Sequence, residues 1–371
     1  MRICSPHAGA AAGSASGGEA YEHNLLAALG RAGDRVHCLM ARGKEVPQGV
    51  DLHRLPIWLG LRWWVGPLLW PRAIRRCWQD CGFDLLRAHS VRFTGPSCLL
   101  ARRRWQLPVP VVAHLHHLDP SPLNQHLERR VLLGADLVIV DSDFVREQAR
   151  ALAPEATLRV VRSGIADIYR PDPEAARRWT WPGDGRFVVA SVGHLIERKD
   201  PLLAVRVLDL LRRAGYGDRV GLVWIGEGPL RASVVAEAER CGIGGMLRLL
   251  GRVDERTKLA VLNRADVFLH TSSLEGFALA PQEAMACGKP VVMRRAASAA
   301  EMVPDGAGFL EWGSAGMAQA LMRLTEDHEL RQRMGAAAQA HAERHFGWQR
   351  TVDGVRAVYE EAVVAYHRAA R

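Results

Sequence analysis

The chain has 371 residues, 48% of them hydrophobic, which is enough for two domains of ordinary size that each bury a core. Its formal net charge is +9, yet no nucleic-acid-binding motif accompanies this excess, so the charge indicates phosphorylated substrates or anionic lipid and no nucleic-acid partner. The seven cysteines are an odd number without metal-ligand spacing, which fits a reducing compartment and predicts no metal site.

The localisation expected from the sequence is cytoplasmic. No uninterrupted apolar run is long enough to span a membrane, and the chain enters a short strand at Arg2 without a signal peptide. Residues up to Asp167 carry 21 basic and 15 acidic side chains, a balance of +6, whereas the remainder carry 28 and 25, a balance of +3. Cys77 and Cys81 lie one helical turn apart and are expected to pack rather than to bind a metal.

The first half of the sequence opens with a strand, a loop, a helix and a second strand, and further strands follow. The helix is expected at 19–31, where apolar residues share one face. Strands are expected at 2–5, 36–40, 110–116, 134–142 and 159–164. The loop at 6–18 is rich in Gly, Ala and Ser but lacks the spacing of a dinucleotide-binding fingerprint, which disfavours a nicotinamide dehydrogenase. A flexible surface loop is the plain alternative for this segment.

A tryptophan-rich segment at 55–70 is followed directly by arginines. Its aromatic and basic residues are Trp58, Trp63, Trp64, Trp70, Arg72, Arg75 and Arg76. Tryptophan and arginine together suit a membrane interface, so peripheral contact of Leu55 to Arg76 with an anionic membrane, at its inner face, is one interpretation. A hydrophobic wall of an acceptor cleft and plain core packing fit the segment equally well. A second basic cluster, at 102–104, is expected on the solvated surface of a helix.

Prolines and glycines at 168–186 predict a linker, after which a second series of strands and helices begins. Strands are expected at 187–193, 220–225, 247–250, 267–271 and 290–293, and helices at 201–213, 230–241 and 258–263. Strands that alternate with helices in both halves predict an α/β protein with two doubly wound domains. After Met317 the chain is expected to be helical.

Residues 267–293 predict a phosphate and sugar site between two buried strands. A loop at 272–280 leads into a helix that is expected to begin at Pro281 and to close at Gly288 in a left-handed conformation. A helix N-terminus offers unpaired backbone N–H groups and the positive end of the helix dipole, which bind phosphate without any side chain. Gly276 in the loop lets the backbone approach a ligand closely.

Two carboxylates, Glu275 and Glu283, bracket this helix start with seven residues between them. On spacing alone, Glu283 could complement the helix dipole and Glu275 could be a solvated loop residue. The motif E-G-F-A-L-A-P-Q-E, followed by A-M-A-C-G-K-P-V-V, resembles the donor site of retaining glycosyltransferases of family 4. The resemblance covers nearly the whole chain and implies the GT-B fold, in which two doubly wound Rossmann-like domains face each other across a cleft.

The resemblance implies a division of the chain and a role for individual residues. An N-terminal acceptor-side domain would span 1–168, a nucleotide-sugar donor domain 169–345, and a helix at 346–371 would cross back to the first domain. The catalytic residues would be His116 and Glu275, which face the transferred sugar. The donor-binding residues would be Gly17, Gly18, His194, Arg198, Lys199, Arg252, Val253, Gly276, Phe277, Ala278, Leu279 and Glu283, with Lys199 neutralising the diphosphate and Glu283 holding the ribose hydroxyls.

The sequence departs from the family pattern at two places. The family carries Gly-Arg-Leu, then three further residues, then Lys. This chain has Gly193-His194-Leu195 and Lys199, so an imidazole replaces a permanently charged guanidinium. Arg198 could reach the phosphate in its place. The second departure is the run R-R-A-A-S-A-A-E at 294–301, where the family commonly has a Gly-Gly turn near the acceptor side.

The expected activity is transfer of a hexose-like sugar from a nucleoside diphosphate sugar to an acceptor hydroxyl, with retention of configuration. The resemblance implies that the reaction uses no metal and no cofactor, and that the nucleoside diphosphate sugar is a substrate. The acceptor would be a glycan, a lipid-linked molecule or a small molecule. Two alternatives are a non-catalytic or degenerate GT-B binding protein, supported by the two departures, and a GT-B sugar-nucleotide epimerase, for which no acid pair is visible.

Overall fold

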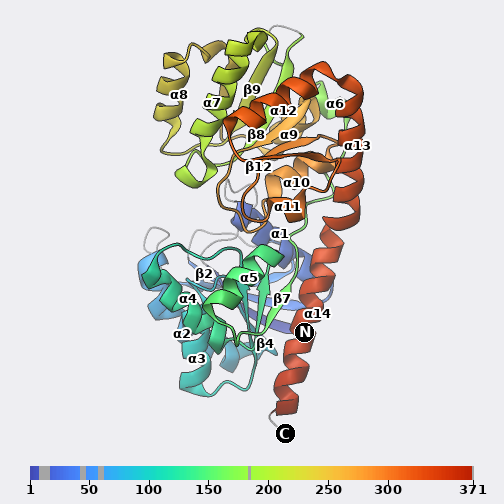
Figure 1. The fold of residues 1–371 in the computed structure, drawn as a ribbon. Helices are drawn as coiled ribbons and strands as arrows, with labels where there is room; N and C mark the ends of the chain where they lie inside the picture. The colour runs from blue at the N-terminus through green and yellow to red at the C-terminus, as the bar shows by residue number, and fades with distance from the viewer. Residues whose placement is uncertain (8–16, 42–46, 57–61, 183–184, 370–371) are drawn as a thin grey trace. The chain divides into compact units, whose positions relative to one another are not determined.

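The structure is a computed structural model, and it describes the whole chain except residues 8–16, 42–46, 57–61, 183–184 and 370–371 (Figure 1). The described residues form two compact units. Unit 1 comprises Met1–Ser163 together with Gln349–Arg371, and unit 2 comprises Gly164–Trp348.

Unit 1 is built on seven parallel strands in the order β3-β2-β1-β4-β5-β6-β7. The strands are β1 (Arg2–Pro6), β2 (Arg35–Ala41), β3 (Val50–Leu55), β4 (Leu85–Ala88), β5 (Val111–Leu115), β6 (Leu137–Val140) and β7 (Leu158–Val160). The helices are α1 (Gly17–Arg31), α2 (Arg62–Cys81), α3 (Gly95–Trp105), α4 (Pro122–Gly134), α5 (Asp143–Leu152) and, after its first residue, α14 (Trp348–Ala369). The inner strands are buried along their whole length, which is why the sequence shows them as short apolar runs.

Unit 2 is built on six parallel strands in the order β10-β9-β8-β11-β12-β13. The strands are β8 (Phe187–Val192), β9 (Val220–Ile225), β10 (Leu247–Gly251), β11 (Val267–His270), β12 (Val291–Arg294) and β13 (Gly308–Glu311). The helices are α6 (Pro173–Ala176), α7 (Pro201–Leu211), α8 (Arg231–Arg240), α9 (Glu255–Arg264), α10 (Leu279–Ala286), α11 (Ala299–Met302), α12 (Ser314–Glu326) and α13 (His328–His345), with short helical turns at η2 (Glu197–Lys199), η3 (Arg212–Tyr216) and η4 (Gly244–Met246). Alternate residues of β8 enter two separate cores, Val188 one and Val189 the other, so both faces of this sheet are covered.

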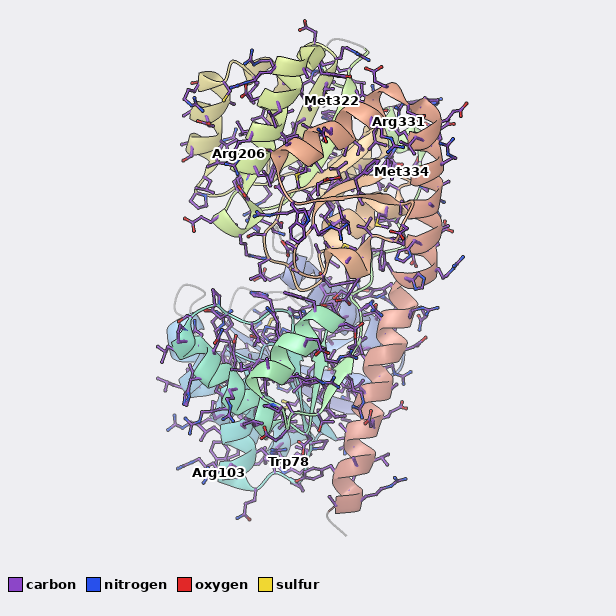
Figure 2. All side chains as sticks on the ribbon, viewed as in Figure 1. Trp78, Arg103, Arg206, Met322, Arg331 and Met334 are labelled. Atoms are coloured by element: carbon purple, nitrogen blue, oxygen red, sulfur yellow. The ribbon has the colours of Figure 1, made fainter. Side chains whose placement is uncertain are left out.

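Large side chains fill both units (Figure 2). In unit 1, Trp78 of α2 packs edge-on against Phe83, with ring centroids 5.0 Å apart. In unit 2, Met334 of α13 is buried in the core, and Arg331 on the same helix donates a hydrogen bond of 2.6 Å to the carbonyl oxygen of Leu324. The two sequence halves are therefore two separately packed α/β units, as predicted.

Both sheets reverse their strand order at one point, between β1 and β4 in unit 1 and between β8 and β11 in unit 2. Open α/β sheets bind ligands outside the carboxyl ends of their strands at such a switch point. The residues that directly follow these four strands are His7, His89, Gly193 and Thr271. Ligand-binding residues are therefore expected at the two switch points.

Helix α10 begins at Leu279, two residues before the predicted start at Pro281. The amides of the first helical turn have no acceptor within the helix, so a proline fits at the third position as well as at the first. Gly288 follows the helix with φ +72°, the left-handed conformation that was predicted.

The segment predicted as a linker, 168–186, packs into unit 2 where it is described. Tyr169 and Trp181 are buried in the core, and Trp181 covers Gly221 so closely that a Cβ there would lie 2.8 Å from the indole. Proline and glycine predict turns correctly, but they carry no information about how deeply the aromatic residues between them are buried.

The basic cluster at 102–104 is only partly the solvated face that was expected. Arg103 and Arg104 are exposed on α3, and Arg103 is labelled in Figure 2. Arg102 instead pairs with Asp136 and donates a hydrogen bond of 2.7 Å to the carbonyl oxygen of Gly134. This arginine ties α3 to the start of β6.

Candidate functional site

A buried ion pair lies at the switch point of unit 1. Arg87 on β4 donates two hydrogen bonds to the carboxylate of Glu22 on α1, at 2.7 and 2.8 Å, and the two side chains are 0% and 3% exposed. Burial opposes both charges, but each partner favours ionisation of the other: the pKa of Arg87 is raised and the pKa of Glu22 is lowered. The geometry is the planar, bidentate one that makes buried arginine pairs strong.

Two further groups of the Arg87 guanidinium, Nε and the second N–H of Nη1, also have partners. Its Nε donates to the hydroxyl oxygen of Tyr359 on α14 at 2.7 Å, and Nη1 donates to Ser5 Oγ at 3.2 Å. The Tyr359 hydroxyl is in turn 2.9 Å from Nε2 of His114 on β5. His114 is therefore a structural histidine, and the network holds α1, β4, β5 and α14 in one arrangement.

His116 is the more accessible member of this region, with 30% of its side chain exposed. It follows β5, and its Nδ1 is 2.7 Å from Oδ2 of Asp141, which follows β6. Its Nε2 is 3.9 Å from Oε1 of Glu22. Burial disfavours the imidazolium, but Asp141 and Glu22 outweigh burial and raise the pKa of His116 above its usual value. A carboxylate on Nδ1 fixes the ring and leaves Nε2 for another partner.

Three further histidines around Arg87 are held neutral. His7 and His89 follow β1 and β4, and their rings stack with centroids 4.2 Å apart. Burial and the nearby positive charges lower the pKa of His89 to about 4 and that of His7 and His114 well below the usual value. Unit 1 thus presents one histidine of raised pKa beside several of lowered pKa.

Gly17 and Gly18 are the first two residues of α1. The loop before them, residues 8–16, lies outside the described part of the chain, so the contacts of this predicted glycine loop are not described. Glu22 lies one turn further along the same helix, which connects the start of α1 to the buried pair.

Glu275 is the centre of the corresponding region in unit 2. Lys199 forms an ion pair with Oε1 of Glu275, and Nη1 of Arg198 lies 3.3 Å from Oε2. Burial alone would raise the pKa of Glu275, but Lys199, His270 and Arg198 lower it to about 2. The side chain of Glu275 is 12% exposed, that of Lys199 15% and that of Arg198 40%, so this cluster of charges is open to a ligand.

Hydrogen bonds fix the two loops that carry these charges to each other. Thr271 Oγ1 donates to the carbonyl oxygen of Lys199 at 2.7 Å, and the amide of Ser273 donates to that of Arg198 at 2.8 Å. The methylenes of Lys199 run past Gly193, where a Cβ would meet them at 3.5 Å. Lys199, Arg198 and Glu275 are therefore brought together, as their predicted roles require.

The predicted phosphate-binding backbone directly follows Glu275 in the chain and leads into α10. Ala278 occupies the N-cap position of α10, and no side chain caps this helix end. Gly276, Phe277 and Ala278 are buried, and Leu279 begins the helix. Uncapped amides at a helix start bind anions.

Glu283 meets a cation that the sequence interpretation did not include. Its Oε1 lies 3.1 Å from Nζ of Lys258 on α9, which also approaches Glu255 at 3.1 Å. Burial raises the pKa of Glu283 and Lys258 opposes that effect, with a net increase. Glu283 is 8% exposed and lies beyond the first turn of α10, which contains no acidic residue, so it is not a simple complement to the helix dipole.

The remaining predicted donor residues are near this region but less constrained. The ring of His194 is half-buried and makes no hydrogen bond or ion pair with another described residue. Arg252 is exposed and Val253 half-buried in the turn between β10 and α9. In the departing segment 294–301, Arg294 pairs with Asp200 at 3.1 Å, and Ser298 Oγ donates to the carbonyl oxygen of Glu275 at 3.3 Å.

Five residues of these two regions were missed from the sequence, namely Glu22, Arg87, Asp141, Lys258 and His270. His270 ends β11 with its Nε2 4.0 Å from Glu275 Oε1, and burial with the nearby Lys199 lowers its pKa to about 3. A usable signal existed for Arg87, because a charged residue inside an apolar strand needs a buried partner. The other four have no such signal in the sequence.

The tryptophan-rich segment lies partly outside the described residues, which exclude Trp58 and the side chains of 62–67. Trp70 is 2% exposed and belongs to the core of unit 1, which contradicts a membrane role for this tryptophan. Arg72, Arg75 and Arg76 are exposed on α2, with Arg75 also stacked on Trp105. None of the helices in the described part of the chain is both long and apolar enough to cross a bilayer.

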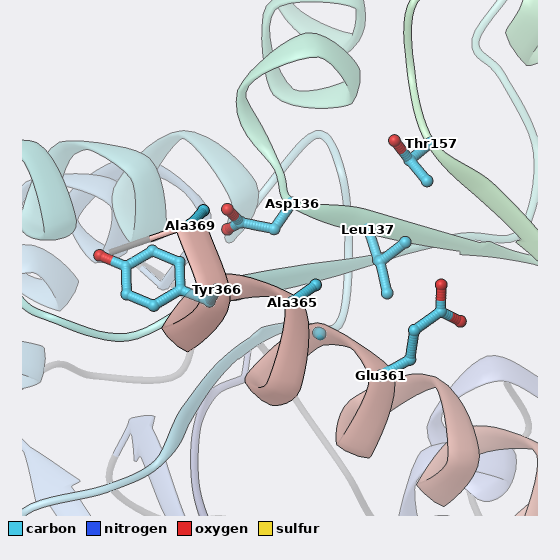
Figure 3. Close-up of a pocket in the computed structure, with 8 residues that line it drawn as sticks. Asp136, Leu137, Thr157, Glu361, Ala365, Tyr366 and Ala369 are labelled. Atoms are coloured by element: carbon cyan, nitrogen blue, oxygen red, sulfur yellow. The ribbon is translucent and has the colours of Figure 1, made fainter. Parts of the chain in front are cut away.

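Among the residues that the structure describes, neither region contains three or more His, Cys, Asp or Glu side chains close enough to share a metal ion. A pocket of about 580 Å³ lies elsewhere on unit 1, between the amino end of β6 and the last turns of α14 (Figure 3). It is lined by Asp136, Leu137, Thr157, Glu361, Ala362, Ala365, Tyr366 and Ala369. No predicted site residue contributes to it.

Comparison with known proteins gives concordant matches over both units. The family described as "Glycosyl transferases group 1" matches residues 174–341, and "Glycosyltransferase Family 4" matches residues 15–167. A D-inositol 3-phosphate glycosyltransferase of Saccharomonospora viridis is 31% identical over 321 residues, which cover 78% of this chain and 72% of that protein.

Two solved structures share the fold at low identity. Sucrose-phosphate synthase from Thermosynechococcus elongatus aligns with a TM-score of 0.83 and 19% identity, over 98% of this chain and 100% of that one. The Anabaena protein HepE, solved in complex with UDP-glucose, aligns with a TM-score of 0.81 and 20% identity, over 97% of this chain and 100% of that one. The two parallel sheets therefore have the GT-B arrangement of strands.

Proposed function

The chain belongs to the family 4 glycosyltransferases, enzymes that take a sugar from a nucleotide sugar, and we propose that it transfers a hexose from a uridine diphosphate sugar to an acceptor hydroxyl with retention of configuration. The choice of uridine diphosphate is supported by the related protein HepE, which was solved with UDP-glucose. The proposal rests chiefly on one observation, the ion-pair cluster of Lys199, Arg198 and Glu275 beside the uncapped start of α10.

In this proposal the cluster exchanges partners when the donor binds. Lys199 and Arg198 neutralise Glu275 in the structure, and their exposure leaves them free to turn to a diphosphate. The amides of 276–279 would hold the same diphosphate, so that its negative charge is stabilised as the sugar departs. Glu275, ionised at neutral pH, would then hold sugar hydroxyls and stabilise positive charge that develops on the sugar.

The replacement at His194 does not remove the second cation from this region. Nη1 of Arg198 donates to the carbonyl oxygen of Leu274 at 3.3 Å and lies equally close to Glu275. We therefore assign to Arg198 the diphosphate contact that the family's arginine makes, and to His194 at most a hydrogen bond. This assignment removes the main support for a non-catalytic binding protein.

Glu283 and His116 complete the proposal. Glu283 would hold the ribose hydroxyls, and Lys258, 3.1 Å away, would oppose the effect of burial on the pKa of this carboxyl. His116 would donate a hydrogen bond from Nε2 to the transferred sugar, because Asp141 occupies Nδ1 and raises the pKa of the ring.

The test is a donor screen with purified full-length protein. UDP-, GDP-, dTDP- and ADP-sugars are added separately, and the shift in melting temperature and the release of nucleoside diphosphate are measured. A UDP-sugar is expected to stabilise the wild type and to be turned over, and proton NMR of the product should show the anomeric configuration of the donor. Stabilisation by none of the four donors would refute the proposal, and an inverted product would refute retention.

A further inference from the structure

A second cluster of chemically active side chains lies in unit 1, apart from the switch point. It consists of His37 on β2, His53 on β3 and Cys81 at the last residue of α2, and one potential ligand atom from each lies within 4.8 Å of the other two. His37 is buried, and the other two are half-buried. Helix α2 returns the chain from the end of β3 to the start of β4, so Cys81 lies at the amino edge of the sheet, opposite the carboxyl edge that carries His116.

The two imidazoles already stand at the separation of ligands that share one ion. His37 Nδ1 is 3.1 Å from His53 Nε2, and tetrahedral zinc with bonds of about 2.0 to 2.1 Å to nitrogen places two such atoms about 3.3 Å apart. Oδ2 of Asp51 lies 3.4 Å from the same His37 nitrogen and accepts a hydrogen bond of 2.8 Å from Arg35 Nε. The cluster thus has two nitrogens and one sulfur within 4.8 Å of one another, and a carboxylate beside one of the nitrogens.

We propose that His37, His53 and Cys81 form a binding site for a borderline divalent metal ion of the zinc class, with Asp51 as the fourth ligand. Imidazole and thiolate are the donors that zinc prefers, and a carboxylate completes a tetrahedral set. Magnesium and calcium, which take oxygen ligands, do not suit this set. Arg35 would hold the Asp51 carboxylate in place from the outer shell.

A hydrogen bond between the two rings is the simplest alternative. It accounts for the 3.1 Å separation but not for the thiol of Cys81, which stands beside both rings. A metal ion engages the thiol and fixes both rings at once.

The site would join three elements, β2, β3 and the end of α2. β3 is an edge strand of the sheet, and of its six residues Leu55 alone is buried. A metal held by β2, β3 and the end of α2 would fasten this edge and the helix behind it. The ion would be structural, since no donor-site residue takes part.

Cobalt(II) is the probe for the test, because a thiolate ligand to cobalt gives a charge-transfer band and a tetrahedral site gives intense visible bands. Full-length protein is stripped with a chelator under reducing conditions and titrated with Co²⁺ and then with Zn²⁺. One Co²⁺ per chain is expected to bind with both sets of bands, and Zn²⁺ should abolish them by displacement. Failure of the wild-type protein to show a thiolate band would overturn the proposal.

Matched variants identify the ligands. Cys81→Ser should lose the charge-transfer band and His53→Gln should weaken binding at least tenfold, whereas Cys241→Ser, a half-buried thiol of unit 2, and His126→Gln, an exposed histidine of unit 1, should titrate like the wild type. Zn²⁺ should raise the melting temperature of the wild type and not that of Cys81→Ser. A band that survives in Cys81→Ser would refute the site, whatever the outcome of the donor screen.

Discussion

Each of the two switch points of this enzyme carries an ion pair between basic side chains and a glutamate. The pair in unit 1 is buried, whereas the one in unit 2 is partly exposed. In unit 1, Arg87 and Glu22 are 0% and 3% exposed, and each nitrogen of the guanidinium already donates to an acceptor within the protein. In unit 2, Lys199 and Arg198 are 15% and 40% exposed and share a single carboxylate. Separating a fully buried ion pair leaves an uncompensated buried charge, which costs much free energy. Two cations that share one partly solvated carboxylate can exchange it for another anion at a smaller cost.

The difference indicates different tasks for the two regions. The network of unit 1 positions other groups: it fixes α1, β4, β5 and α14 around His116, which alone of its histidines has a raised pKa. In the cluster of unit 2, a phosphate can replace Glu275 as the partner of Lys199 and Arg198. Substitutions should therefore damage stability in unit 1 and turnover in unit 2.

The largest expected effect is on the stability of unit 1. Arg87→Met should lower the free energy of unfolding by about 3–5 kcal/mol, because it leaves Glu22 charged and buried without a partner. Arg159→Ala, which breaks an exposed pair with Glu361, should change it by less than about 1 kcal/mol. Urea denaturation monitored by circular dichroism measures both. The double variant Arg87→Met/Glu22→Leu should recover part of the lost free energy of unfolding. Equal losses for Arg87→Met and Arg159→Ala would show that the buried pair contributes no more to stability than an exposed one.

The next effect is on turnover through unit 2. Lys199→Ala and Glu275→Gln should each lower kcat by about 10²–10³-fold with the fold intact, since each removes one group that stabilises charge in the transition state. Arg333→Ala, an exposed arginine paired with Glu329 on α13, is the control and should be neutral. Wild-type rates of sugar transfer in both Lys199→Ala and Glu275→Gln would show that the cluster is not the donor site.

The two units should lose stability at different pH values as the solution is acidified. The pKa of His89 is lowered to about 4, and that of His7 and His114 is also lowered, so these histidines stay neutral in the folded protein while the unfolded chain takes up protons below about pH 6.5. Stability that is complete above pH 6.5 is therefore lost progressively as the pH falls towards 4. In unit 2, Glu275, with a pKa of about 2, retains its contribution until the pH falls below about 4.5.

Hydrogen exchange followed by mass spectrometry, corrected for the intrinsic pH dependence, resolves the two units. Amides of β1, β4 and β5 should lose protection at a higher pH than those of β8 and β11. His89→Gln should reduce the acid sensitivity of unit 1 and leave unit 2 unchanged. Simultaneous loss of protection in both units would show that the buried histidines do not set the difference.

A smaller effect is expected on His116 itself. Asp141→Asn removes the carboxylate that favours the imidazolium, so the pKa of His116 should fall. NMR titration of labelled histidine side chains reports this pKa directly. Asp143→Asn, two residues further along the chain and exposed, is the matched control and should leave the His116 titration unchanged.

The smallest effect concerns the positive surface of unit 1. Arg72, Arg75 and Arg76 are exposed on α2, and we expect them to give weak binding to anionic vesicles that is lost at high salt. Flotation of the wild type and of the triple glutamine variant with phosphatidylserine vesicles measures this binding. Equal flotation of the two proteins would assign any membrane contact to another surface.

Much of the fold was predictable because it depends on local patterns. Apolar runs at 220–225 and 267–271 predicted β9 and β11 to within one residue, and the alternation of strands with helices predicted both parallel sheets. Several boundaries differed, among them the start of α10 and the strand predicted at 134–142, which the structure confines to β6. In 168–186 the burial of Tyr169 and Trp181 depends on tertiary packing, which turn composition does not report. The motif around Glu275 was found because its residues are close in sequence.

The sequence by itself determined the fold class, the family and the residues of unit 2 that gather around Glu275, since strand periodicity and a contiguous motif are local properties of the chain. Only the tertiary structure paired Glu22 with Arg87, His116 with Asp141, Glu283 with Lys258, and the two histidines with Cys81. Each of these contacts joins residues of separate strands and helices. The sequence separation of such residues carries no information about distance until the strand order of a sheet is fixed, and strand order is a property of the folded chain.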